Sequence, residues 1–361
     1  MEATRYNRQI ILPEVGISGQ QKLQQAKVLL IGVGGLGSAV LPYLVAAGVG
    51  EIGIIDDDTI DITNLQRQVI YDSNSVGKSK VLKAQKMALA LNPSVKINAI
   101  DEKLNPKNAI SLFEKYDIMV DATDSLNSKY LIDDACCVTN KPFVYGSIYK
   151  FEGQVSVFNY KNGPKYRCLF PETANDSPNC NELGVLGTSV GLIGMFQANE
   201  VLKMVLEIGE LLSGKLLVYN ILNNEQQKFE FCKSVEHTID LEAFEMKYAS
   251  DKDFVIEILA AEAFEQINNP QVVFLDVRNW DESPKIDIQN CIQIPLHNLE
   301  NELSKLNVDS TIFAFCQSGI RSKKAVEILL QHNFKNAKSI IGGANSLAKF
   351  TQDSLDSVSI K

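Results

Sequence analysis

The sequence has no uninterrupted apolar run of membrane-spanning length. Its first residues, MEATRYNRQI, lack the basic and apolar regions of a secretory signal peptide. It also has no basic block, and its formal net charge of -9 argues against nucleic acid as the main partner. We therefore expect a cytoplasmic protein that has neither a membrane nor a nucleic acid as partner.

No C-x-x-C pair occurs among the cysteines. Seven are present, at positions 136, 137, 168, 180, 232, 291 and 316. In a cytosolic chain an odd number of cysteines indicates thiol chemistry or burial rather than disulfides.

The stretch 27–67 has the pattern of a nucleotide-binding βαβ unit. An apolar run, 28–31, leads into a glycine turn, 32–37; a helix-like segment and a second apolar run, 52–55, follow and end on Asp56. Glycines let the backbone approach a phosphate, and a helix N-terminus attracts an anion. Asp56 is a candidate to accept hydrogen bonds from ribose hydroxyls. The glycine pattern alone does not identify the nucleotide.

Apolar runs alternate with helical segments, which predicts an α/β fold with a doubly wound, mostly parallel sheet. The expected strands are 28–31, 52–55, 95–100, 117–121 and 142–147, then antiparallel strands 153–160, 216–222 and 227–231. A second, smaller α/β domain follows. We predict domains at 1–235 and 256–361, joined by a linker at 236–255.

Polar residues follow several of the expected strands in the first domain. They are Asp56, Asn64, Arg67, Lys80 and Asp124, with Ser125 beside the last. Each alone is more commonly a surface residue. Ligands bind beyond the carboxyl ends of parallel strands, so we expect these side chains to converge there.

Cys316 follows the expected strand 311–315 and begins the loop CQSGIRS. A lone cysteine at a strand end is more often buried structure. Here the loop N–H groups, the following helix and Arg321 all favour an anion, so the thiolate is a candidate persulfide carrier. Four residues separate Cys316 from Arg321, one fewer than in the C-x5-R loops that cradle phosphate. Sulfur transfer therefore fits better than phosphatase chemistry.

The chain resembles a known family over nearly its whole length. The matching motifs are RYNRQIILP, GVGGLGS, DDDTIDITNLQRQ, VGKSK, DATD and YRCLFPE, with CQSGIRS downstream. Residues 5–232 resemble the MoeB/ThiF (HesA/MoeB/ThiF) adenylyltransferases, relatives of ubiquitin-activating enzymes. Residues from about 256 onward resemble a rhodanese domain.

The resemblance implies ATP-dependent adenylylation of the C-terminal glycine of a ubiquitin-like sulfur carrier ending in Gly-Gly, of the MoaD or ThiS type. It implies that Gly35 lies against the phosphates, that Asp56 holds the ribose, and that Asp124, with Ser125 beside it, binds Mg2+. Asn64, Arg67 and Lys80 would clamp the triphosphate.

The resemblance also implies roles for residues outside that set. Arg8 would reach into the site of a partner subunit, which implies a homodimer. Cys180 matches a cysteine that is a candidate to link to the carrier, although an idle thiol is about as common. Cys316, in the loop with Gly319 and Arg321, would carry a persulfide. Sulfur from thiosulfate or a cysteine desulfurase would then give the carrier thiocarboxylate, for molybdopterin or thiamine synthesis.

The sequence departs from the family at its zinc site, where relatives carry two C-x-x-C pairs. Here only Cys168 and Cys232 stand near those positions. A closed shell usually takes four thiolates, so we expect no structural zinc.

Two other hypotheses stay open at this point. A nicotinamide-dependent oxidoreductase would explain the glycines and Asp56, but not Arg67, Lys80 or the CQSGIRS loop. A non-catalytic scaffold that kept the fold would have no need of Asp124 and Cys316.

Overall fold

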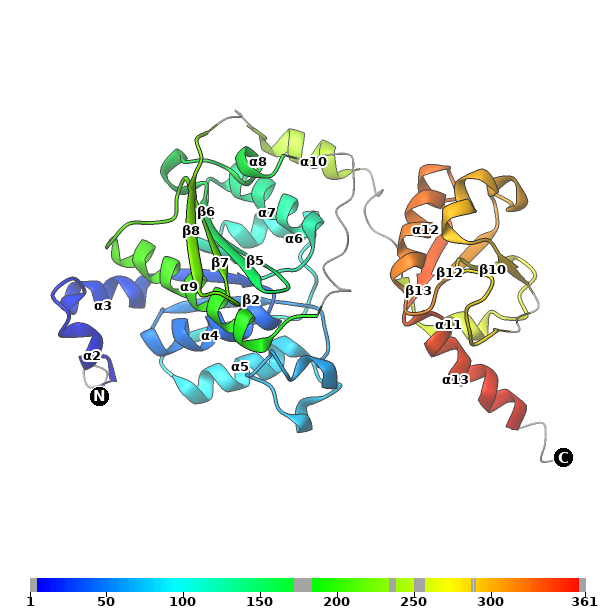
Figure 1. Ribbon diagram of the computed structural model, residues 1–361, viewed down its shortest axis with the longest axis horizontal. Coiled ribbons are helices and arrows are strands. Elements are labelled where there is room, and N and C mark those ends of the chain that lie inside the picture. The colour runs from blue at the N-terminus through cyan, green and yellow to red at the C-terminus, as the bar shows by residue number, and fades with distance from the viewer. Residues whose placement is uncertain are drawn as a thin grey trace. The chain divides into compact units, whose positions relative to one another are not determined.

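The computed structural model describes residues 5–171, 184–233, 238–249, 257–286, 288 and 290–356. The chain divides into two compact units, unit 1 at residues 1–246 and unit 2 at residues 247–361 (Figure 1). Each unit has its own sheet and is described by itself. The domain limits predicted from the sequence stay a prediction. Helix α10 (Leu241–Ala249) lies inside the stretch expected to be a linker, with Phe244 buried.

Unit 1 contains an eight-stranded sheet in the order β3-β2-β1-β4-β5-β6-β7-β8. The first five strands in this order, β3, β2, β1, β4 and β5, are parallel. Strands β6, β7 and β8 each pair antiparallel with the strand before them. The strands are β1 (Lys27–Ile31), β2 (Glu51–Ile55), β3 (Lys96–Ile100), β4 (Ile118–Asp121), β5 (Phe143–Tyr149), β6 (Glu152–Phe158), β7 (Lys215–Asn220) and β8 (Glu225–Glu230). The predicted mostly parallel, doubly wound sheet is thereby confirmed. Strand β8 is exposed along its whole length.

Helices cover both faces of this sheet. The main ones are α4 (Gly35–Ala47), α5 (Lys80–Leu91), α6 (Pro106–Phe113), α7 (Leu126–Thr139) and α9 (Gly187–Leu206). Helix α4 packs against α5 and α9, and α6 packs against α7. Right-handed crossovers place α4 and α5 on the face opposite α6 and α7 (Figure 1). Shorter helical segments are α2 (Asn7–Ile10), α3 (Gly16–Gln25), η1 (Ile62–Asn64), η2 (Ser73–Ser75), η3 (Tyr160–Asn162) and α8 (Tyr166–Leu169).

The strand order reverses between β1 and β4, and the glycine turn lies at this point. Gly32 has φ +91°, and a Cβ there would lie 2.8 Å from the Ala122 carbonyl oxygen. A Cβ on Gly37 would lie 2.2 Å from the Gly32 carbonyl oxygen. Only glycine fits these close approaches. The turn thus sits at the reversal of strand order, where such sheets bind ligands.

Unit 2 contains a five-stranded, all-parallel sheet in the order β11-β10-β12-β13-β9. Its elements are β9 (Glu257–Ile258), α11 (Ala260–Glu265), β10 (Val272–Asp276), β11 (Cys291–Gln293), η6 (Leu296–Asn301), η7 (Leu303–Lys305), β12 (Thr311–Phe315), α12 (Ile320–Gln331), β13 (Ala337–Ile340) and α13 (Gly343–Asp356). The predicted smaller α/β domain is confirmed, although the two-residue β9 and helix α13 were not foreseen.

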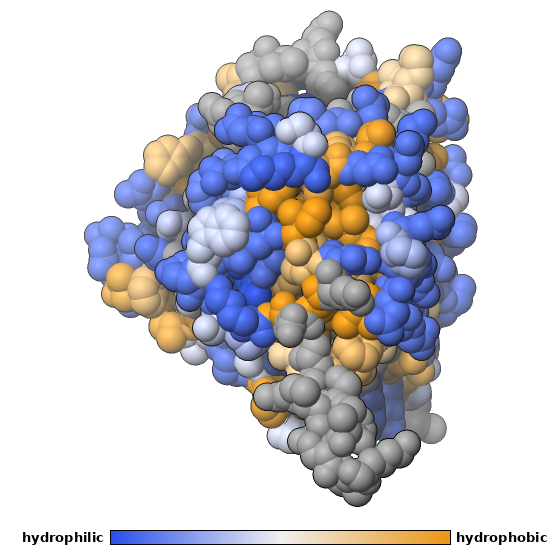
Figure 2. Space-filling model, turned by 90° about the vertical axis from the view of Figure 1, so that its right-hand side faces the viewer, coloured by the Kyte–Doolittle hydropathy of each residue, from blue (hydrophilic) through white to orange (hydrophobic). Residues whose placement is uncertain are grey.

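Apolar side chains gather at the centre of the face drawn in Figure 2, bordered by polar ones. In the part of the chain that the structure describes, no helix combines the length and apolarity that crossing a bilayer requires.

Candidate active sites

Asp56 follows β2 and binds the glycine turn directly. Its carboxylate accepts hydrogen bonds from the backbone N–H groups of Val33, at 2.8 Å, and Asp58, at 2.9 Å. Burial raises the pKa of Asp56, while the charge of Lys80 and these two N–H groups oppose that shift. Asp56, the predicted ribose contact, is therefore held in position by hydrogen bonds from the backbone of the glycine turn and of Asp58.

Lys80 begins α5 and is 5% exposed. Its Nζ lies 2.7 Å from Oδ2 of Asp58, which is itself exposed. Tyr71, which the sequence reasoning missed, donates its hydroxyl to the Val33 carbonyl at 2.8 Å. The same hydroxyl lies 3.3 Å from the Lys80 carbonyl, so it joins the glycine turn to the start of α5.

Asn64 ends η1, and Arg67 lies just after it. The Arg67 Cγ lies 3.7 Å from the place where a Cβ on Gly35 would stand, so the predicted arginine does border the turn. The same Cβ would lie 2.6 Å from Cγ1 of Val190, which gives Gly35 a packing role beside the predicted one. The Asn64 side chain instead accepts the Asp61 N–H at 3.2 Å, in a capping box.

Gln68 is a second residue that the sequence reasoning missed. It is 4% exposed, and its Nε2 lies 3.7 Å from the position of a Cβ on Gly34. Among the described residues, its buried Oε1 has no hydrogen-bond partner. An unpaired buried acceptor is costly, so this oxygen suits a donor on a ligand held at the turn. The space beside Gly34 and the unpaired Gln68 oxygen therefore fit a nucleotide at the glycine turn.

Asp124 and Ser125 follow β4 and are exposed. Ser125 caps α7 through the Ser128 N–H at 3.4 Å. No described contact joins either residue to Asp56 or Lys80.

The loop that leads to Asp124 is held by a buried ion pair that the sequence reasoning missed. Lys129 Nζ lies 2.8 Å from Asp121 Oδ2 and donates to the carbonyls of Thr123, at 3.0 Å, and Gly146, at 3.1 Å. Asp121 Oδ1 accepts both the N–H and the hydroxyl of Thr123. This pair therefore fixes the backbone that presents Asp124.

Two groups of carboxylates are candidates for Mg2+. The ligand atoms of Asp56, Asp57 and Asp58 lie within 4.8 Å of one another. Asp56 is already bound to two N–H groups and Asp58 to Lys80, so two of these three carboxylates already have partners. Asp124 is exposed and fits the oxygen donor that Mg2+ prefers.

The remaining predicted residues of unit 1 lie outside this network. Arg8 in α2 is exposed, and within the described part of the chain its side chain makes no hydrogen bond or ion pair. Cys180 lies outside the described residues. Cys168 is half-buried and Cys232 is exposed. The expected absence of zinc stays a prediction.

Cys316 of unit 2 follows β12 directly, as predicted, and is 1% exposed. Its Sγ accepts the Gly319 N–H at 3.1 Å. Burial alone would raise the pKa of the Cys316 thiol, but the N–H groups of Ser322, Ser318 and Gly319, with the Ser322 hydroxyl, outweigh it and lower the pKa. The cradle stabilises a thiolate, the form that attacks sulfur.

Gly343 packs closely against the backbone of the Cys316 loop. A Cβ on Gly343 would lie 2.1 Å from the Cys316 carbonyl oxygen, and that oxygen accepts the Ala344 N–H at 2.7 Å. The sequence shows the glycine pair 342–343, but only the fold reveals that it contacts Cys316.

Arg321 ends the loop and is held by Glu282, which the sequence reasoning missed. The guanidinium meets the carboxylate in two parallel hydrogen bonds of 2.6 and 2.5 Å. These bonds lower the pKa of Glu282 to about 2. Beside them, Arg278 is fully buried and paired with Asp276 at 2.7 Å.

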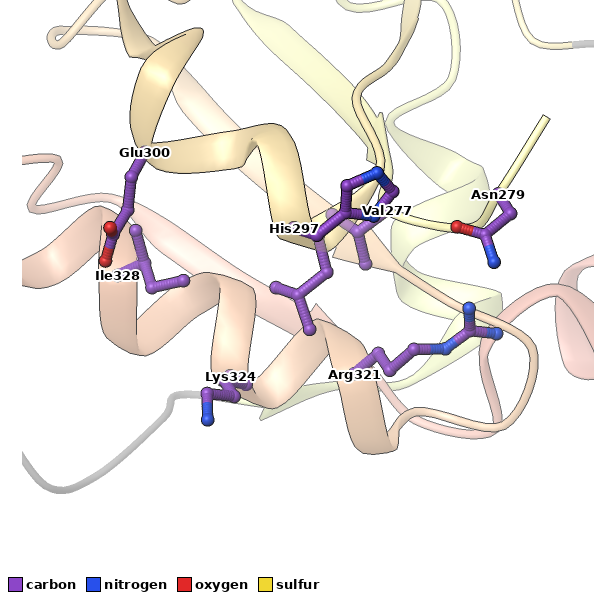
Figure 3. Close-up of a pocket in the computed structure, with 8 residues that line it drawn as sticks. Val277, Asn279, His297, Glu300, Arg321, Lys324 and Ile328 are labelled. Carbon is purple, nitrogen blue, oxygen red and sulfur yellow. The ribbon is translucent and has the colours of Figure 1, made fainter. Parts of the chain in front are cut away.

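A cavity of about 500 Å³ opens beside α12 (Figure 3). Its lining is Val277, Asn279, Leu296, His297, Glu300, Arg321, Lys324 and Ile328. Arg321 and Asn279 point toward one another at one end, and Glu300 and Ile328 lie at the other (Figure 3). The cavity therefore begins at the arginine of the Cys316 loop.

The cysteines differ in pKa, and alkylation should reveal it. We expect Cys316 to react with iodoacetamide with a midpoint below its usual pKa of 9.0, because its N–H cradle lowers the pKa. Burial raises the pKa of Cys291 to about 12, so this thiol should react only at much higher pH. Peptide mass spectrometry across a pH series measures both.

The variant that tests this cradle is Ser322→Ala. It removes a hydroxyl that donates to the Gly319 carbonyl at 3.0 Å and helps to lower the Cys316 pKa, so it should move the Cys316 midpoint upward. A Cys316 midpoint at or above 9.0 in the unchanged protein would contradict the description of the cradle.

Two family models match the chain. Residues 6–238 match the ThiF family and residues 259–349 match the rhodanese-like domain. The chain belongs to the ThiF family. By family it is an adenylyltransferase joined to a sulfurtransferase-type domain, so the oxidoreductase hypothesis is not favoured.

Similar proteins support this assignment, and the first two match the chain over nearly its whole length. A probable molybdopterin-synthase adenylyltransferase of Porphyra purpurea is 38% identical over 96% of this chain and 92% of its own length. The probable adenylyltransferase/sulfurtransferase MoeZ of Mycobacterium tuberculosis is 37% identical over 97% of this chain and 94% of its own. A sulfur carrier protein adenylyltransferase of Thermus thermophilus is 45% identical over 63% of this chain and 86% of its own.

Solved structures share the fold of unit 1. Among them is E. coli MccB with AMPCPP and MccA, with a TM-score of 0.58 at 23% identity, over 65% of this chain and 73% of that one. At this identity the likeness shows the fold alone.

Proposed function

We propose that the protein adenylylates the C-terminal glycine of a ubiquitin-like sulfur carrier with ATP and then supplies sulfur from a Cys316 persulfide. The observation that carries the proposal is the thiolate cradle of Cys316 on a chain whose other unit holds Lys80 and Arg67 at a glycine turn. The names of the relatives favour a carrier of molybdopterin synthesis; thiamine synthesis is the second candidate.

In the first reaction the carrier carboxylate attacks the α-phosphorus of ATP, and pyrophosphate leaves. A carboxylate and a triphosphate repel each other, so positive charge must neutralise them. Arg67 and Lys80, with Asn64, would clamp the triphosphate. The turn at Gly35 would lie against the phosphates, and Asp56 would hold the ribose. Asp124, beside Ser125, would hold Mg2+, which supplies further charge neutralisation.

In the second reaction the outer sulfur of the Cys316 persulfide attacks the acyl carbon, and AMP leaves. The product is an acyl disulfide between the carrier and Cys316. A thiol then attacks the Cys316 sulfur, and the carrier leaves as a thiocarboxylate. The disulfide formed on Cys316 is reduced by a second thiol. Cys180 is a candidate for a transient link to the carrier. Thiosulfate or a cysteine desulfurase would restore the persulfide.

Arg8 would complete the adenylylation site of a second copy, since its exposed side chain has no partner within the described residues of its own chain. Sedimentation tests this homodimer. A monomer that keeps full adenylylation activity would contradict it.

The test is pyrophosphate exchange that depends on a carrier ending in Gly-Gly. We expect exchange with the intact carrier and none with a carrier that lacks the last glycine. We expect Lys80→Met to lower the rate by about 10²-fold, the usual cost of one charge-stabilising donor.

Lys78→Met is the matched control, because Lys78 is exposed and, among the described residues, its side chain binds the nearby Asn74 carbonyl alone; it should keep the original rate. Exchange with no carrier ending in Gly-Gly, or an unchanged rate in Lys80→Met, would refute the adenylylation half of the proposal.

A further inference from the structure

The guanidinium of Arg321 is already occupied by a carboxylate. Glu282 binds it through both oxygens, at 2.6 and 2.5 Å. The carboxylate is in turn fixed by the Asn279 N–H at 2.9 Å. Bidentate pairs of this kind are the strongest in proteins and set the direction of the guanidinium.

The second arginine that touches the Cys316 loop is neutralised in the same way. Arg278 lies under the Phe315 ring and donates to Gln317 Oε1 at 3.3 Å. Its other guanidinium N–H groups bind Asp276 at 2.7 to 3.1 Å. The fixed charges of both pairs therefore sum to about zero beside the sulfur.

The N–H groups of the cradle remain, and they stabilise the thiolate form of Cys316; Arg321, although paired with Glu282, also interacts with this sulfur. An incoming donor has to approach this thiolate with its own charge. A thiosulfate dianion brings two charges to a site whose arginines are already paired, whereas a thiol persulfide brings one.

We propose that Glu282 is a specificity-determining residue of the sulfur-transfer site: by occupying Arg321, it makes Cys316 accept sulfur from a monoanionic thiol persulfide in preference to thiosulfate. This inference rests on the sulfur-transfer half of the proposed function and names its donor class.

Both transfers balance with the Cys316 thiolate as nucleophile. It attacks the outer sulfur of a persulfide R–S–S⁻, a new S–S bond forms on Cys316, and the electron pair of the broken bond leaves on the thiolate R–S⁻. With thiosulfate the same attack releases sulfite. Only the charge of the donor and of the leaving group differs between the two.

The experiment measures persulfide formation on Cys316 with thiosulfate and with cysteine persulfide, by mass spectrometry of the loaded protein and by donor kinetics. The unchanged protein should have the higher kcat/KM with cysteine persulfide. Glu282→Gln keeps an acceptor for Asn279 and releases the charge of Arg321. We expect it to lower the KM for thiosulfate by about five- to tenfold, an effect that shrinks as salt is added. The kcat/KM for cysteine persulfide should change less than about twofold, because that donor gains less from one added positive charge.

Two controls separate charge from structure. Glu282→Asp keeps the charge and should keep the original donor preference. Glu302→Gln removes the same charge in the same unit from a pair with Lys305 at 2.6 Å, and should change neither donor.

An unchanged protein that uses thiosulfate at least as well as cysteine persulfide overturns the inference, and so does an unchanged thiosulfate KM in Glu282→Gln. If Cys316 takes sulfur from neither donor, the sulfur-transfer half of the proposed function fails instead.

Discussion

Replacing Lys129 with methionine is expected to lower the free energy of unfolding of unit 1 by about 3–5 kcal/mol. Lys129 is 5% exposed, and its ammonium faces Asp121, which is fully buried. Methionine has a similar volume but leaves this carboxylate without its counter-charge, and two backbone carbonyls lose a donor. Urea denaturation of unit 1 measures the change.

The matched control for Lys129→Met is Lys96→Met. Lys96 pairs with Glu51 at 3.0 Å, but its side chain is 65% exposed, so the loss should stay within about 1 kcal/mol. A further change, Asp121→Asn, should recover part of the stability in the Lys129→Met background because it removes the unpaired charge. If Lys129→Met and Lys96→Met destabilise equally, the buried pair does not hold the loop of Asp124.

Replacing Cys316 with serine is expected to abolish thiocarboxylate formation and leave carrier-dependent pyrophosphate exchange intact. Serine keeps the size of the side chain and its hydrogen bonds in the cradle, but an oxygen cannot store a sulfane sulfur. Intact mass spectrometry of the carrier, after incubation with ATP and a sulfur donor, measures the product. The expected loss is complete, down to the uncatalysed background.

Cys291→Ser is the control for Cys316→Ser, because Cys291 lies on β11 with its pKa raised by burial to about 12. It should keep both reactions. Sulfur transfer that survives in Cys316→Ser would move the persulfide to another thiol. Exchange that is lost in Cys316→Ser would mean that the serine disturbs more than the cradle.

Local sequence patterns were enough to predict the strands around the glycine turn and the position of the Cys316 loop. Runs such as 28–31 and 311–315 are mostly apolar and are followed by glycine or cysteine. They can be recognised as strands without knowing which distant segment pairs with them. The exception is β9, whose two residues form a strand only by pairing with β13. Its formation depends on a contact far along the chain.

The hydrogen-bond and ion-pair partners of the predicted residues could not be predicted from the sequence, because these contacts also join positions far apart in the chain. Glu282 and Arg321 are 39 positions apart, and no spacing rule connects them. Tyr71 and Val33 are 38 positions apart. Lys129 lies one helical turn into α7, where a lysine ordinarily indicates a solvated face. The sequence thus predicts which side chains are candidates for the chemistry, while the fold determines which charged side chains they pair with.

Strand β8 sets a limit on how this protein can assemble. Among the described residues it is the last strand of its sheet and has no neighbouring strand on its outer edge. Its sequence, EQQKFE, is exposed throughout. Charged side chains on such an edge discourage another chain from adding a strand. Two copies should therefore associate through helices and loops, and the sheet should not continue from one molecule into the next.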